Sequence, residues 1–103
     1  MEDVDAIRLS RTGHPGAFQH LVHRYQRRAL GHARALTGND ADAADAAQDA
    51  FFDAFRSLDR FDLQQEFYPW FYVLLRHRCF KQRTRHGTRL ESGPLPERQG
   101  AQV

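Results

Sequence analysis

The chain has a single cysteine, Cys79, among its 103 residues. One thiol forms no internal disulfide and gives no second sulfur ligand for zinc, so the sequence fits a reducing compartment and we expect a cytoplasmic protein. Uninterrupted apolar runs are only a few residues long, against the ~20 that a bilayer span requires. No signal-peptide pattern is present either, so we expect no membrane partner.

Strand-like alternation, internal repeats, a glycine-rich phosphate loop, a catalytic triad and metal-spaced carboxylates are also missing from the sequence. These absences favour an all-α protein that is not an enzyme and that needs no cofactor or metal. His20 and His23 share one helix face, but no third ligand lies nearby, so we interpret them as surface histidines. The length allows one modest hydrophobic core.

Lysine is scarce, because 14 of the 15 basic residues are arginine, whose planar side chain suits stacking and bidentate contacts. The formal net charge of +2 hides a segregation along the chain. Residues 39–62 carry a net charge of −5 and residues 66–89 carry +5. Opposite faces of opposite charge predict two different partners.

Apolar periodicity predicts a compact bundle of three to four helices. A short first helix covers residues 1–11, and a second runs from Pro15 to Thr37 with Gly38 as its left-handed cap. Asn39 or Asp40 caps a third helix that ends near residue 58. The predicted core face of the second helix is Phe18, Leu21, Val22, Tyr25, Ala29, Ala33 and Leu36; that of the third is Ala44, Ala47, Phe51, Ala54, Phe55 and Leu58.

Periodicity lapses over residues 58–66, which we interpret as a loop before the last long helix. That helix is expected to start between Tyr68 and Trp70, because Pro69 is tolerated only in a first turn, and to end near Arg85. Its predicted core residues are Phe71, Leu74 and Leu75. We expect residues 1–87 to form one helical domain, and residues 88–103 to be a disordered tail or the start of an interdomain linker.

Four aspartates of the third helix fall in one narrow sector of a helical wheel, and Phe52 lies at its edge. Such a stripe is most often a solvated charged face. However, like charges at helical neighbour spacing repel one another without helping the fold, and an exposed phenylalanine is a typical interface anchor. A basic protein partner would explain both features. The four residues are Asp42, Asp45, Asp49 and Asp53.

Five aromatic residues lie between Phe67 and Tyr72 and lead into an arginine-rich helix. They cannot all face one core, so some rings are expected at the surface beside cations. Flat apolar rings next to positive charge suit unstacked bases and their phosphates, which favours single-stranded nucleic acid. The alternative is that Phe67, Trp70 and Phe71 close the core and the arginines form a solvated helix end.

The stretch from Asp42 to Phe61, followed by Phe67-Tyr-Pro-Trp-Phe-Tyr72, resembles region two of the extracytoplasmic-function class of bacterial sigma factors. The segment from Ala17 to Asn39 is also similar, including Tyr25 and the Leu-Thr-Gly-Asn turn. The resemblance covers about residues 3–85. It implies a helical transcription-initiation domain that binds core RNA polymerase and opens promoter DNA.

In that family the third helix binds the clamp coiled coil of the largest catalytic subunit. The matching positions here are Asp45, Gln48, Asp49 and Phe52. The loop at residues 59–67 would form the wall of a pocket for a base flipped out of the −10 element, and the last helix would follow the non-template single strand. The residues expected at DNA are Arg60, Phe61, Gln64, Gln65, Phe67, Trp70, Tyr72, Arg76, His77, Lys81, Arg83 and Arg85.

His77 stands where many family members have asparagine, so the base preference is left open, as are the regulated genes and the inducing signal. The resemblance also implies an anti-sigma partner and a monomer in isolation. The family's −35-binding module is missing, which favours a piece of a longer factor. Two alternatives stay open: a sigma-like module that binds only an anti-sigma factor, and a general single-strand binder.

Overall fold

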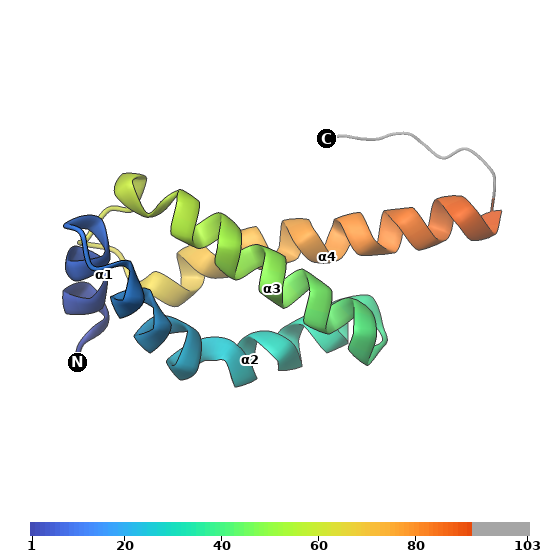
Figure 1. Cartoon of the computed structure of the whole chain (residues 1–103). Coiled ribbons are helices and arrows are strands. Elements are labelled where there is room, and N and C mark those ends of the chain that lie inside the picture. The colour runs from blue at the N-terminus through green and yellow to red at the C-terminus, as the bar shows by residue number, and fades with distance from the viewer. Residues whose placement is uncertain (92–103) are drawn as a thin grey trace.

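The computed structural model describes the backbone of residues 1–91 and the side chains of residues 1–85, and within that part every regular element is helical. Three long helices lie along one another, and the shorter α1 packs at the end where α4 begins (Figure 1). None of the described helices has the length and apolar content that crossing a membrane requires. The elements are α1 (Asp3–Arg11), η1 (Pro15–Phe18), α2 (Gln19–Thr37), α3 (Asp40–Arg56), η2 (Leu58–Arg60) and α4 (Phe67–Glu91).

The turn between α2 and α3 follows the sequence prediction. Gly38 adopts φ 88° in the left-handed region, which is favourable for a residue without a Cβ. Asn39 caps α3, because its Oδ1 atom accepts a hydrogen bond of 2.8 Å from the Asp42 backbone N–H. The two helices therefore form the expected antiparallel pair with a very short connection.

The core lies where α2, α3 and α4 face one another. Phe71 and Leu75 are fully buried, and the rings of Phe51 and Phe71 stack with their centroids 4.4 Å apart. Both α4 residues were predicted in the core. Burial of such side chains contributes about 1.5–3 kcal/mol each to folding, so this aromatic contact anchors α3 against α4.

Two predictions for the buried face of α3 are wrong. Ala44 is exposed, and Phe55 keeps 39% of its surface accessible. Ala43, Ala46 and Ala50 take the buried positions instead. Alanine occurs on nearly every side of this helix, so the apolar pattern did not distinguish the faces. Only packing against α2 and α4 selects the alanines that are buried.

The segment between α3 and α4 is held by α1. Arg11 donates a hydrogen bond of 2.9 Å from Nε to the Leu58 carbonyl oxygen and a second one from Nη2 to the Phe61 carbonyl oxygen. These carbonyls flank η2, so one guanidinium fixes both of its ends. No pattern in the sequence indicated this role for Arg11.

α4 begins at Phe67, slightly before the predicted start, and Pro69 lies in its first turn as expected. The helix continues to Glu91, beyond the predicted end near Arg85. Residues 88–91, which we expected in the tail, therefore belong to the helix. The rest of the predicted tail, residues 92–103, lies outside the described residues.

Candidate nucleic-acid and protein-binding surfaces

The aromatic residues at the start of α4 divide between the core and the surface. Phe67 is 2% exposed and Phe61 4%, and their ring centroids are 6.1 Å apart. The expectation that both rings are open to DNA is wrong, because they close the core beneath the loop. Trp70 packs edge-on against Phe61, with ring centroids 4.9 Å apart, but Trp70 is only partly buried. Its indole therefore keeps an accessible surface beside the loop.

Two side chains of α2 join this aromatic group. His32 Nδ1 lies 2.9 Å from the Tyr68 hydroxyl oxygen. The ring centroids of His32 and the half-buried Tyr72 are 5.1 Å apart. The Arg28 guanidinium lies 4.3 Å from the Tyr68 ring centroid, a cation–π contact. Burial raises the pKa of Tyr68. Sequence analysis missed Arg28 and His32; the available signal was their spacing of four residues, which places both on one side of α2.

A pocket of about 490 Å³ opens where α1, α2, the loop and the first turn of α4 meet. Its volume is within the range of small-molecule sites, and its lining carries charges of both signs. A pocket walled by the loop was expected, but the contributions of α1 and α2 were not. Its polar walls include Asp3, Arg24, Arg28, Gln65 and Glu66.

The rim of this pocket is tied together through Asp3 at the start of α1. The Tyr25 hydroxyl donates a hydrogen bond to Asp3, and Arg24 forms an ion pair with the same carboxylate. Burial first, and the hydrogen bond to Asp3 second, raise the pKa of Tyr25 to about 12. Tyr25 therefore remains a protonated donor at neutral pH and anchors α1 to α2.

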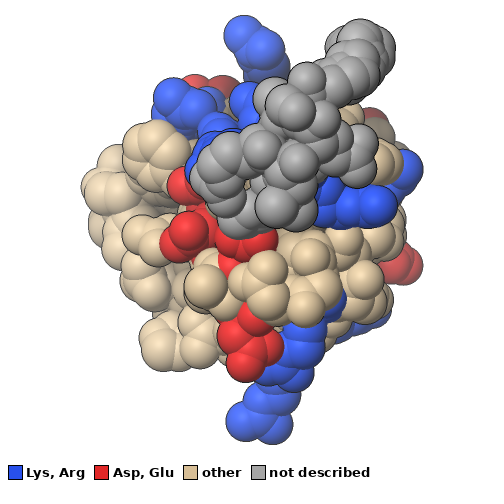
Figure 2. All heavy atoms as spheres, turned by 90° about the vertical axis from the view of Figure 1, so that its right-hand side faces the viewer, with Lys and Arg blue, Asp and Glu red and all other residues tan. Residues whose placement is uncertain are grey.

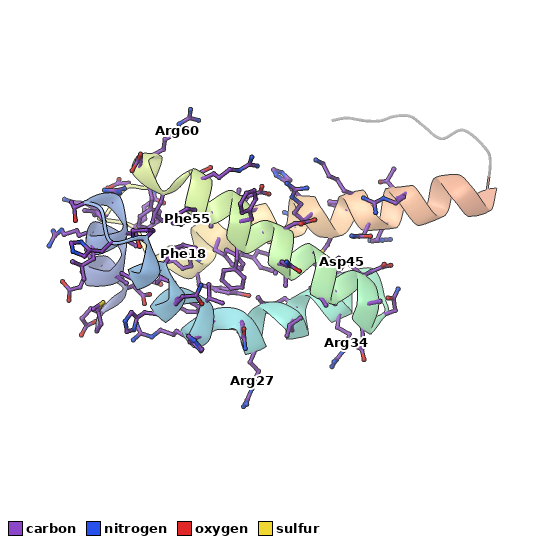
Figure 3. All side chains as sticks on the ribbon, in the orientation of Figure 1. Phe18, Arg27, Arg34, Asp45, Phe55 and Arg60 are labelled. Atoms are coloured by element: carbon purple, nitrogen blue, oxygen red, sulfur yellow. The ribbon has the colours of Figure 1, made fainter. Side chains whose placement is uncertain are left out.

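The loop presents its polar side chains outward. Asp62 Oδ1 accepts a hydrogen bond of 2.9 Å from the Gln64 backbone N–H, and the Asp62 carbonyl accepts one of 2.9 Å from Gln65. This side-chain turn leaves the side chains of Gln64 and Gln65 exposed. Arg60 projects outward from η2 (Figure 3). Arg60, Gln64 and Gln65, which are three of the residues that we expected at DNA, are thus accessible.

The residues of α4 that we expected at DNA lie on two flanks of the helix and not on one. With about 100° of rotation per residue, the centres of the two flanks are about 140° apart. One flank carries Trp70, His77 and Lys81; the other carries Tyr72, Arg76 and Arg83. Arg85 lies outside both groups. All five basic or imidazole side chains are exposed, whereas Tyr72 and Trp70 are partly buried.

The predicted polymerase-binding residues on α3 are all exposed. Phe52 keeps 57% of its surface accessible, and the Arg56 guanidinium lies 4.8 Å from its ring centroid. Asp49 lies about one helical turn before Phe52 and Asp45 about two turns before it, so both carboxylates share a side of α3 with this ring. The α3 surface therefore combines an apolar anchor with two accessible carboxylates.

One member of the aspartate stripe has a structural role that we did not predict. Asp53 accepts two hydrogen bonds from Arg78 of α4, 2.6 Å from Nε and 2.8 Å from Nη2. The hydrogen bonds from Arg78 hold the pKa of Asp53 below its usual value. Arg78 also reaches Asp49 at 3.9 Å. Asp53 is therefore bound to α4, which the stripe of aspartates in the sequence did not indicate.

The acidic and basic surfaces consequently meet along the contact between α3 and α4, and do not lie on opposite faces as we expected. Figure 2 shows acidic and basic side chains close together on the end of the molecule that it faces. The bidentate pair between Arg78 and Asp53 joins the two surfaces. The two candidate surfaces thus share one structural ion pair.

We predict that Asp53→Asn lowers the free energy of unfolding by about 1.5–3 kcal/mol, the usual contribution of hydrogen bonds to a charged group. Asp40→Asn is the matched control, because Asp40 forms an exposed pair with Arg34 and should lose about 1 kcal/mol or less. Urea unfolding at pH 7 measures both. Equal losses in the two variants would contradict the structural role of Asp53.

The same contact predicts a dependence on pH. The folded-state pKa of Asp53 lies below its ordinary value of 3.8, so the native state favours the ionised form. The resulting stability is present above the unfolded-state pKa and disappears as the pH falls through the folded-state pKa. The difference between wild type and Asp53→Asn should therefore shrink below about pH 4.

A groove of about 590 Å³ runs beside the α3 surface. Phe18 and Phe55 lie together between α2 and α3, with ring centroids 5.3 Å apart (Figure 3). The groove continues to Gln48, Asp49 and Phe52. The polymerase-binding residues that we predicted thus border an apolar depression, and Phe55 becomes part of the same surface instead of the core.

In the part of the chain that the structure describes, no three His, Cys, Asp or Glu side chains gather as a metal site. Cys79 is 1% exposed, and burial raises the pKa of its thiol. It packs as a small apolar side chain, in agreement with its position on the core side of α4.

Comparison with known proteins identifies the fold family. The family model for sigma-70 region 2 matches residues 21–89. The RNA polymerase sigma-H factor of Pseudomonas aeruginosa is 34% identical over 71 residues, which cover 69% of this chain and 37% of that factor. The chain therefore spans well under half the length of this curated relative.

A solved structure is similar over nearly its whole length. It is the NMR structure of the complex formed by an engineered region 2 of sigmaE with GTAAAA, and it matches with a TM-score of 0.80 and 30% identity. The match covers 88% of this chain and 95% of that chain. The residues matched by the family model include α3, the loop and most of α4, which carry the candidate surfaces. Because that model matches well over half of the chain, the chain belongs to the sigma-70 region 2 family.

Proposed function

We propose that this chain is a transcription-initiation domain that binds core RNA polymerase and holds the promoter −10 element as single-stranded DNA. The observation that carries the proposal is the close match to an engineered region 2 of sigmaE, whose structure was solved in complex with GTAAAA. Promoter opening requires no covalent step. It requires a surface that binds the separated strand better than the duplex.

The loop and the start of α4 supply such a surface. Stacking of one base on an aromatic side chain contributes about 1–3 kcal/mol, whereas one DNA base-pair step contributes about 1.4 kcal/mol on average. One or two stacked bases therefore offset a lost step. The accessible part of Trp70 offers one stacking site, and the exposed amides of Gln64 and Gln65 are available to base edges.

The pocket of about 490 Å³ beside the loop is our candidate site for a flipped base. Its arginines, amide and carboxylates offer donors and acceptors to the polar edge of a base, while Phe67 and Tyr68 form an aromatic wall. Exposed basic residues farther along α4 would contact phosphates, a contribution that depends on salt and not on sequence.

The α3 surface is our candidate polymerase site, with the clamp coiled coil of the largest catalytic subunit as the partner. Accessible Asp45 and Asp49 suit a basic surface, and Phe52 suits a central apolar anchor. The neighbouring groove would receive apolar side chains of the same partner. An anti-sigma factor that covered either surface would block initiation. The protein would act as a monomer in the cytoplasm, where the polymerase is found.

Fluorescence anisotropy with labelled GTAAAA tests the DNA half of this proposal. We expect the full chain to bind this strand with micromolar or weaker affinity, and a scrambled strand of the same composition more weakly still. Double-stranded probes of the same sequence should bind less tightly than the single strand. Equal affinity for the matched and scrambled strands would contradict sequence recognition and would leave a general single-strand binder as the explanation.

A further inference from the structure

α2 and the adjoining flank of α4 form a surface to which the two helices themselves contribute no acidic side chain up to Arg85. α2 contains four arginines and no aspartate or glutamate, and α4 has none up to Arg85. The carboxylates that face α4 come from α3 and hold Arg78 on the opposite flank. Contacts at the loop and Trp70 would use only the start of α4. The basic residues farther along α4 are assigned above to phosphates, and no side chain there is yet assigned to a base.

Phe80 lies on this basic surface with 50% of its area exposed. The guanidinium carbons of Arg76 and Arg83 lie 5.8 Å and 5.9 Å from its ring centroid. The two arginines are one turn before and one turn after Phe80, so cations flank the ring along the helix axis. Sequence analysis did not assign Phe80 a role, although this spacing was visible in the sequence.

We propose that Phe80 is a second stacking platform for single-stranded nucleic acid, with Arg76 and Arg83 contacting the phosphates on either side of the stacked base. The inference rests on the proposed function and extends its DNA-binding surface. Every base has an aromatic face, so a ring framed by cations binds a strand without a strong sequence requirement.

The surroundings of the ring favour nucleic acid over a protein partner. The depression beside Phe80, which Leu36 and Cys79 help to line, has a volume of only about 10 Å³. Such a shallow site gives an apolar side chain of a protein no pocket to fill. Of the four α2 arginines, Arg24 pairs with Asp3 and Arg34 with Asp40. The described structure shows no such ion pair for Arg27, Arg28, Arg76 or Arg83, and their positive charge suits a polyanion.

The position of Phe80 sets the length of strand that can reach it. Trp70 and Phe80 are ten residues apart, or about 15 Å along a helix at 1.5 Å per residue. At the stacked spacing of about 3.4 Å per nucleotide this distance corresponds to about four steps. A strand with fewer than about four nucleotides beyond Trp70 therefore ends before Phe80, and a strand with more nucleotides on that side reaches it.

The test compares GTAAAA with versions extended by six thymines at either the 5′ or the 3′ end, using the full chain and fluorescence anisotropy. For the wild type, extension at one of the two ends should tighten binding at least about fivefold. Phe80→Ala should remove this gain and leave the affinity for GTAAAA itself unchanged. Phe80→Trp should retain the gain because it keeps an aromatic face.

Leu30→Ala is the control, because Leu30 is 36% exposed on α2 and has no proposed contact with DNA. The proposal is overturned if extension gives the wild type no gain, or if Phe80→Ala shows the same gain as the wild type. It is also overturned if Phe80→Ala weakens binding to core polymerase and leaves the extended strand unaffected. Loss of the preference for GTAAAA over its scrambled form would instead count against the proposed function.

Discussion

Asp45→Arg is expected to abolish recovery of core RNA polymerase in a pull-down with the tagged chain while leaving the domain folded. Asp45 is exposed on α3, and among the described side chains it forms no ion pair of the kind that holds Asp53. Reversal of its charge places like charges against each other across the proposed interface, which costs several kcal/mol. Each 1.4 kcal/mol is tenfold in affinity, so recovery should fall about a hundredfold or more.

Asp5→Arg makes the same change in net charge on α1, outside the proposed polymerase surface, and should leave recovery nearly unchanged. Circular dichroism and thermal melting would verify that both variants keep the helical fold. Retained polymerase binding by Asp45→Arg, or equal loss in both variants, would show that the α3 surface is not the docking site. The sigma-like module that binds only an anti-sigma factor would then become the better explanation.

Trp70→Ala is expected to weaken binding of single-stranded GTAAAA about 5- to 150-fold, the equivalent of losing one stacked base worth about 1–3 kcal/mol. Trp70→Phe should recover most of the affinity, because phenylalanine keeps a ring at the same position. Fluorescence anisotropy at a fixed salt concentration measures all three proteins, since phosphate contacts change with salt.

Trp70 also packs on Phe61 and Phe67, so its truncation lowers stability as well. Leu74→Ala controls for this effect, because Leu74 is a partly buried residue of the same helix without a proposed DNA contact. A comparable loss of DNA affinity in Leu74→Ala would assign the effect of Trp70 to folding. Unchanged affinity in Trp70→Ala would remove the stacking contact from the proposal.

The exposure of the residues proposed to bind polymerase was predictable from the sequence. The exposure of Asp45, Gln48, Asp49 and Phe52 follows from the 3.6-residue period of one helix, which depends on local geometry alone. The same pattern could not reveal that Asp53 binds Arg78, because those residues are 25 positions apart. Such pairing depends on how α3 packs against α4.

The candidate DNA site was predicted less completely. The sequence correctly indicated a loop, a following aromatic helix and exposed basic residues. It did not indicate that Phe61 and Phe67 are buried, because the same run of aromatic residues is compatible with a buried core and with an exposed stacking surface. Arg28 and His32 were missed because they reach the aromatic group from a different helix.

The sequence by itself determined the all-α class, the helix caps at Gly38 and Asn39, the division of charge and the family resemblance, since each depends on neighbouring residues or on helical periodicity. Only the tertiary structure decided which rings are buried, where the pocket beside the loop and the groove beside α3 open, and which carboxylate pairs with Arg78. Burial and ion pairing depend on contacts between segments distant in the chain, and a linear pattern does not specify those contacts.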